Sequence, residues 1–243
     1  MEEPGSPPGP SATHLAPRTV PWNHAVAWYA VAMRLFKFAP FSFIGFALLV
    51  IVTELVLQAL PGALALAGQI VTPLVGCALV YACAAADRRV APTWRMLLLV
   101  FRAGGNAIAA IIAASLLTTA AQQLAAWWIA DANLFAMESM EKLSAPAILG
   151  VFAIGVLAAL PLTFIPMLVL LGRVPLREAF VASGVAFAQN TMPLLVYGAL
   201  SLVLILFGML TMGAGFALAL PLEAAASYAA WKDVFDVRDA PAL

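Results

Sequence analysis

Two acidic side chains stand inside long apolar runs of this chain. Glu223 occurs in the stretch LPLEAAASYAAWKDVF, with Ser227 four residues after it, and Glu54 has Gln58 four residues after it. Residues four apart share one face of a helix, so each acid has a polar neighbour. A charge at the centre of a transmembrane helix costs roughly 2.5 to 3.5 kcal/mol on insertion scales, and such residues often mark ion or proton pathways. Glu223, Ser227, Glu54 and Gln58 are therefore the candidate polar site within the membrane.

The position of Glu223 allows two interpretations. It follows Pro221, whose ring leaves the carbonyl of Ala217 without its helical donor. An acid beside a proline break near the bilayer midplane is typical of a proton- or ion-coupled carrier. The alternative is a neutral, structural carboxyl bonded to Ser227, to a backbone carbonyl or to a neighbouring helix, in an interior that is dry or filled by an acyl chain. Glu54 lies nearer the outer surface, so the two acids pair only if their helices tilt.

Other chemistry is sparsely represented. The only histidines, His14 and His24, precede the first apolar run, which excludes a histidine-centred metal site or catalytic triad within the bilayer. The chain has no P-loop. The turn RAGGN, residues 102–106, has backbone N–H groups that can cradle a lipid phosphate, although a hinge into the next apolar run is the simpler interpretation. We predict no catalytic residue, no metal and no cofactor.

The composition places these residues in a membrane protein. Of the 243 residues, 64% are hydrophobic and 10% are charged, whereas about 25% of the residues in a soluble domain are charged. Lysine plus arginine and aspartate plus glutamate number 12 each, so the net charge gives no reason to expect a nucleic-acid partner. We expect membrane lipids, and a protein partner as the alternative.

The elements that must position the polar site are transmembrane helices. A bilayer core about 30 Å thick needs about 20 apolar residues per helix. Six runs of that kind are predicted, at residues 40–60, 63–86, 106–130, 146–171, 193–211 and 214–231. They form one membrane domain, 22–236, between a Pro-rich disordered cytoplasmic tail, 1–21, and a short tail, 237–243.

The basic residues predict the orientation. With six spans, eleven of the 12 lysines and arginines fall on one side, and only Lys142 falls on the other. Loops rich in these residues stay in the cytoplasm, so both termini are predicted to be cytoplasmic. Three of the inner segments combine a basic face with an apolar face, which predicts helices lying in the headgroup plane. Their candidate lipid-headgroup contacts are Arg34, Lys37, Arg95, Arg102 and Arg177.

The chain also indicates a threefold internal repeat of surface helix, outward span and returning span. Each returning span contains Pro-Leu at a similar depth, at Pro73, Pro161 and Pro221. The predicted fold is thus all-α: a polytopic bundle of six transmembrane helices and three interfacial amphipathic helices.

This plan, together with the ending ASYAAWKDVF, resembles a family of uncharacterised six-span proteobacterial inner-membrane proteins. It is more distantly similar to the membrane domain of glycerophosphoryl diester phosphodiesterases, whose catalytic domain is a separate soluble unit. The resemblance implies a fold and an inner-membrane location, and it carries over no functional residue. We expect a non-enzymatic protein that binds lipid or a partner; the alternative is a proton- or ion-coupled secondary transporter that uses Glu223.

Overall fold

The computed structural model describes residues 16–60, 67–135 and 143–238, and within these ranges the regular structure is helical throughout. Helices come in the order α1 (His24–Phe38), α2 (Pro40–Gln58), α3 (Gly68–Asp87), α4 (Met96–Arg102), α5 (Gly105–Ala130), α7 (Ala145–Ala159), the 3-10 turn η3 (Leu160–Leu162), α8 (Ile165–Leu170), α9 (Leu176–Gln189), α10 (Thr191–Leu210) and α11 (Phe216–Val234). The predicted all-α class is confirmed.

Five segments of the described chain are long and apolar enough to cross a membrane: α2, α3, α5, the α7–α8 segment Ala145–Leu170, and α10. Their bounds lie close to the first five predicted runs. The sixth predicted run forms α11, which carries Glu223, Lys232 and Asp233 and is not among the five. The predicted loop residue Lys142 and the turn after α2 lie outside the described residues.

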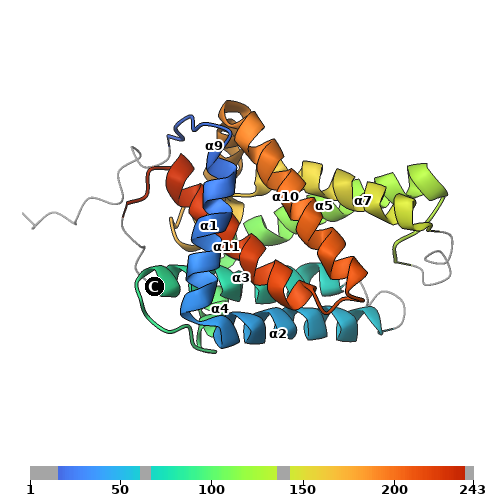
Figure 1. The fold of residues 1–243 in the computed structure, drawn as a ribbon, viewed down its shortest axis with the longest axis horizontal. Helices are drawn as coiled ribbons and strands as arrows, with labels where there is room; N and C mark the ends of the chain where they lie inside the picture. Colours follow the sequence, from blue (N-terminus) through green and yellow to red (C-terminus); the bar gives the residue numbers. More distant parts are fainter. Residues whose placement is uncertain (1–15, 61–66, 136–142, 239–243) are drawn as a thin grey trace, which may run out of the picture.

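Helix α3 is the most buried of the five long apolar segments. In Figure 1, α2, α3, α5 and α7 run along the long axis, and α1 crosses their direction at one end. Over an apolar stretch of 18 residues in each helix, 61% of the α3 stretch is buried, against 17% of the α2 stretch and 17% of the α5 stretch. Large side chains such as Leu55, Leu117 and Leu124 are exposed on those outer helices. An apolar exterior of this extent is stable only against lipid.

The fourth predicted run, 146–171, is not one continuous α-helix. Pro161 and Pro166 lack the N–H group that a helix interior requires, so α7 gives way to η3 and then to α8. The buried Ser183 of α9 bonds two backbone groups at this interruption: its Oγ donates to the carbonyl of Pro161 at 2.7 Å and accepts from the N–H of Phe164 at 3.3 Å. Non-helical backbone at this depth requires such a partner inside the protein.

Helices α1, α4 and α9 form at the three segments for which interfacial helices are predicted. All three lie at the same end of the bundle as the C-terminal end of α11 (Figure 1). α1 packs its face of Ala25, Trp28, Ala32 and Leu35 inward, and α11 is its main neighbour. The charged end of the bundle is therefore built mainly from these short helices and the turns between them.

The prediction that residues 1–21 form a disordered tail is wrong for the last residues of that range. Although residues 1–15 lie outside the described chain, the backbone N–H of Arg18 donates to the carbonyl of Val234 at 2.8 Å, and that of Val20 donates to Asn190 Oδ1 at 2.8 Å. Asn190 is 1% exposed and also donates to the carbonyl of Arg18. These hydrogen bonds hold the segment around Arg18 and Val20 in place, although its proline-rich composition predicts disorder.

Candidate functional site

Glu223 is bound by two hydroxyl groups from two other helices. The Ser201 hydroxyl of α10 donates to Glu223 Oε1 at 2.7 Å, and the Tyr29 hydroxyl of α1 donates to Glu223 Oε2 at 2.8 Å. The two hydroxyl oxygens lie 3.1 Å apart. The carboxyl group therefore joins the surface helix α1 to the apolar helices α10 and α11.

The hydroxyl groups around Glu223 have fewer protons than they have short polar contacts. Ser201 Oγ is 3.0 Å from the carbonyl of Tyr197 as well as close to Glu223 and Tyr29, which makes four short contacts for two hydroxyl protons. Each hydroxyl has one proton to donate. Burial, and then the adjacent carboxylate, raise the pKa of the Tyr29 hydroxyl, so this group remains a donor. A proton on Glu223 would fill one more contact.

Aromatic packing holds Tyr29 in place. Its ring stacks on that of Tyr197, with centroids 5.8 Å apart and an angle of 26° between the planes. Trp28 approaches the same Tyr197 ring edge-on at 6.3 Å. Because Trp28 and Tyr197 are buried, the direction of the Tyr29 hydroxyl is fixed by packing before any ligand binds.

Ser227, the neighbour expected from the sequence, does not bind Glu223. Its hydroxyl donates to the carbonyl of Ala224 in its own helix at 3.0 Å. The expectation of a partner on a neighbouring helix is met instead by Ser201 and Tyr29, which the sequence analysis missed. Ser201 carried one usable signal, since it is an isolated hydroxyl within the apolar run of α10. Nothing in the sequence indicated Tyr29, because it lies 194 residues from Glu223.

A cleft with a volume of about 250 Å³ reaches Glu223 between α7, α10 and α11. Its polar lining residues are Glu223, Ser201, Thr163 and Tyr197. Eight apolar or small residues form the rest of its wall: Val156, Ala159, Leu160, Leu204, Ile205, Phe216, Ala219 and Leu220. The cleft is therefore an apolar groove with polar groups gathered around the acid.

Glu54 belongs to a separate polar cluster. It accepts hydrogen bonds from Gln58 Nε2, as the spacing predicts, and from Thr72 Oγ1 of α3. The partners of Glu54 lie on α2 and α3, whereas those of Glu223 lie on α1 and α10, so the structure gives the two acids no shared partner. Glu54 thus joins two neighbouring helices of the bundle.

The five predicted headgroup contacts are all exposed at the charged end of the bundle. Within the described residues, none of Arg34, Lys37, Arg95, Arg102 and Arg177 takes part in an ion pair. Their guanidinium and ammonium groups are thus free to meet lipid phosphates. Arg102 differs from the other four because it also borders an internal cavity.

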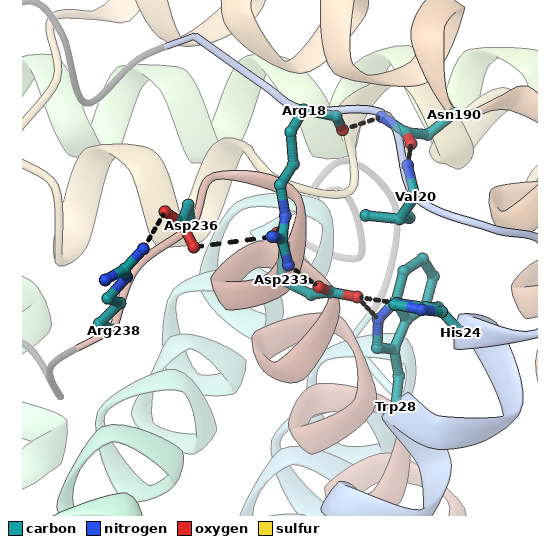
Figure 2. A network of polar contacts seen from close by, with 8 residues as sticks. All are labelled: Arg18, Val20, His24, Trp28, Asn190, Asp233, Asp236 and Arg238. Carbon is teal, nitrogen blue, oxygen red and sulfur yellow. Dashed lines mark hydrogen bonds and ion pairs between the residues drawn. The ribbon is translucent and has the colours of Figure 1, made fainter.

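A network that the sequence analysis did not foresee joins the two ends of the membrane domain (Figure 2). Asp233, near the end of α11, accepts from His24 Nδ1 at 2.7 Å, from Trp28 Nε1 at 2.9 Å and from the Arg18 guanidinium. Burial raises the pKa of the Asp233 carboxyl, but the hydrogen bonds from His24, Trp28 and Arg18 outweigh this effect and hold the pKa below its usual value.

A second ion pair fastens α11 to α3. Lys232 Nζ lies 2.6 Å from Asp87 Oδ2, and the Tyr228 hydroxyl donates to the same oxygen at 3.0 Å. The charged residues that set α11 apart from the five apolar helices are therefore paired at its end, and Glu223 is the only one within its apolar part.

The helices and the site together define a multi-pass α-helical membrane protein. Comparison with protein-family models, with curated proteins and with solved structures finds no match for this chain. The resemblance to the six-span inner-membrane family therefore stays a prediction from the sequence.

Proposed function

We propose that this chain is a non-enzymatic protein of the bacterial inner membrane that binds an acyl chain or a similar long apolar group in the α7–α10–α11 cleft. The observation that supports this function is the cleft itself, whose wall is apolar except around Glu223. Its volume of about 250 Å³ lies just below the range of about 300 to 1,000 Å³ for pockets that hold drug-sized ligands. A single chain suits it better than a whole phospholipid.

The proposed topology has six crossings, with α11 as the sixth and both termini in the cytoplasm. At about 1.5 Å per residue, the 19 residues of α11 span about 28 Å, close to the thickness of a hydrocarbon core. Lys232 and Asp233 stand at its inner end, where charged groups reach the headgroups. This topology puts α1, α4 and α9 at the cytoplasmic surface, with Arg34, Lys37, Arg95, Arg102 and Arg177 contacting anionic headgroups.

The threefold repeat is part of the proposal. Pro73 lies within α3, Pro161 within η3 and Pro221 within α11, and each stands in the returning helix of its unit. Such prolines are tolerated in a bilayer where neighbouring helices satisfy the freed carbonyls. The second unit bends at its proline, whereas the first and third remain helical through it.

The test compares the lipids retained by matched variants. The full-length protein is purified with native lipids, and bound molecules are identified by native mass spectrometry. Ala159→Phe places a ring in the cleft and leaves the Glu223 side chain itself unchanged, and Leu157→Phe, on the exposed side of α7, is its control. We expect the wild type and Leu157→Phe to retain an acyl-chain ligand that Ala159→Phe loses. Equal retention by all three proteins would refute the proposal.

Glu223→Gln tests the polar end of the cleft, with Glu54→Gln as the control at the other acid. If the carboxyl contacts the ligand, Glu223→Gln alone lowers the amount bound. If it only joins helices, Glu223→Gln retains the ligand and lowers the melting temperature.

A proton-coupled transporter is the second candidate function, favoured by one observation: Glu223 and Tyr29 form a hydrogen-bonded chain that links the apolar interior to a surface helix. The mainly apolar lining of the cleft argues against an aqueous path. In proteoliposomes with an internal pH-sensitive dye, a transporter would show proton flux that Glu223→Gln abolishes and Glu54→Gln preserves. Equal flux in wild type and Glu223→Gln would exclude this candidate.

A further inference from the structure

A second, larger cavity lies away from Glu223, among α3, the turn between α4 and α5, and the turn before α9. Its volume is about 570 Å³, within the usual range for ligand pockets. One side is apolar and includes Leu99, Val169 and Leu170, while the other side contains Arg102, Arg173 and the Gly104–Gly105 turn. The cavity therefore combines an apolar wall with a basic wall.

The charge of this cavity is entirely positive. Arg102 and Arg173 are its only charged lining residues: Arg102 ends α4, and Arg173 follows α8, 71 positions later in the chain. Within the described residues, neither arginine forms an ion pair. Both guanidinium groups border the same cavity, so one anion bound there can accept hydrogen bonds from both.

A tyrosine hydroxyl that lines the cavity is a further donor for a ligand. Tyr81 of α3 lines the cavity and is only 6% exposed, yet its hydroxyl has no hydrogen-bond partner among the described residues. Arg173 lines the same cavity. The Tyr81 hydroxyl is therefore available to donate a hydrogen bond to a ligand in the cavity.

The turn between α4 and α5 adds backbone donors. Gly104 has φ of 86°, a conformation that favours glycine, and it caps the 26-residue helix α5. The first N–H groups of a helix have no partner within the helix and attract anions. Gly105, Asn106 and Ala107, the first three residues of α5, all line the cavity.

We propose that this cavity binds a phosphate ester, with Arg102 and Arg173 contacting the phosphate oxygens, Tyr81 donating a hydrogen bond, and the apolar wall receiving the attached carbon chain. The ester is either a phospholipid headgroup or a soluble phosphate compound. The two sources share this recognition chemistry and differ in whether an acyl chain is required. The site is separate from the Glu223 cleft, and its test does not depend on that function.

Two kinds of variant isolate the site. Arg102→Gln and Arg173→Gln each remove one charge, and Arg89→Gln is the matched control, since Arg89 is exposed, does not line the cavity and is not one of the proposed headgroup contacts. Gly105→Asp brings a negative charge to the cavity at a position where an added Cβ meets no atom within 4 Å. An acid in the first turn stabilises a helix, so this variant should fold and repel the anion.

The soluble arm titrates the full-length protein in a neutral detergent with inorganic phosphate and with glycerol 3-phosphate at constant ionic strength, using isothermal calorimetry. The lipid arm adds phosphatidylglycerol and counts bound lipid by native mass spectrometry. The loss of one charged hydrogen bond between the protein and a phosphate weakens binding by about tenfold or more. We expect that loss in Arg102→Gln and Arg173→Gln, no measurable binding in Gly105→Asp, and wild-type binding in Arg89→Gln.

The two arms separate the sources of the phosphate. Binding of phosphatidylglycerol alone assigns a lipid headgroup, and binding of glycerol 3-phosphate at comparable strength assigns a soluble ester. The proposal is overturned if the folded wild type binds none of the three probes more tightly than Gly105→Asp does. It is equally overturned if Arg89→Gln loses as much binding as Arg102→Gln, because the effect would then be a general surface attraction.

Discussion

Replacing Asp233 by alanine should destabilise the whole membrane domain, although this residue lies outside its apolar part. The carboxylate accepts hydrogen bonds from three side chains of the N-terminal segment: Arg18, His24 and Trp28 (Figure 2). Those donors connect the end of α11 to α1 and to the chain before it. Asp233→Ala removes all three contacts at once, whereas the neighbouring Asp236 makes only exposed ion pairs to Arg18 and Arg238.

The expected magnitude follows from the burial of each donor. Trp28 is 2% exposed, and its N–H without an acceptor costs about 1 to 3 kcal/mol. The Arg18 side chain is 51% exposed, so its ion pair contributes at most about 1 kcal/mol. We expect Asp233→Ala to lower the free energy of unfolding by about 2 to 4 kcal/mol. Asp236→Ala, whose side chain is 52% exposed, should lower it by less than about 0.5 kcal/mol.

The assay is thermal unfolding of both variants in a neutral detergent, followed by tryptophan fluorescence. For a chain of this size, 1 kcal/mol corresponds to roughly 2 to 4 °C, so Asp233→Ala should melt at least roughly 4 °C below wild type and Asp236→Ala within roughly 2 °C of it. Equal melting temperatures for the two variants would refute the assignment of Asp233 as the central acceptor.

The pH dependence gives an independent check. The folded-state pKa of Asp233 lies below its usual value, so the unfolded chain binds more protons at this group than the folded chain as the pH falls. The contribution of Asp233 to stability is therefore complete above the ordinary aspartate pKa of about 3.9 and is lost as the pH falls through the lower, folded-state pKa. The difference in melting temperature between wild type and Asp233→Ala should shrink on acidification; a growing difference would contradict this reasoning.

Two further predictions concern the packing of α11. Lys232→Met removes the partner of Asp87, and because both side chains are only partly exposed we expect a loss of about 1 to 2 kcal/mol in thermal unfolding; a variant as stable as wild type would show that the pair contributes nothing. Gly208→Ala brings a Cβ within 2.5 Å of the Phe216 ring and should cost about 1 to 3 kcal/mol, whereas Gly184→Ala meets no atom within 4 Å and should stabilise α9 by about 0.5 to 1 kcal/mol. Similar melting temperatures for these two glycine variants would contradict the close approach of Gly208 to the Phe216 ring.

The long apolar helices could be predicted from the sequence because bilayer thickness fixes their length. The run predicted at 40–60 is the helix Pro40–Gln58, which begins at a proline suited to the first helical turn. The run predicted at 106–130 is Gly105–Ala130, which ends where Asp131 adopts a left-handed conformation with φ of 48°. Both ends are set by local residues, so no information about neighbouring helices is required.

The site could be predicted only in part, because its partners are distant in sequence. The pair of Glu54 and Gln58 follows from helical spacing alone and is confirmed. The contact of Tyr29 with Glu223 depends on how α1 crosses α11, which no hydrophobic pattern encodes. The same reason explains the ordered segment around Arg18, whose partner Asp233 lies 215 residues away. A proline-rich composition predicts low burial, but it gives no information about a specific hydrogen-bond acceptor in a distant part of the chain.

The proposed threefold repeat gives the Glu223 cluster its sharpest interpretation. Val75 and Thr163 occupy the positions after Pro-Leu that correspond to Glu223 in the first two units. Thr163 lines the same cleft as Glu223, but its hydroxyl donates to the carbonyl of Ala159 in its own chain segment, which is a purely local bond. A helix at this position therefore needs no acid for its own stability. Glu223 alone reaches two other helices, through Tyr29 and Ser201, and this is why its replacement separates a ligand-binding role from a structural one.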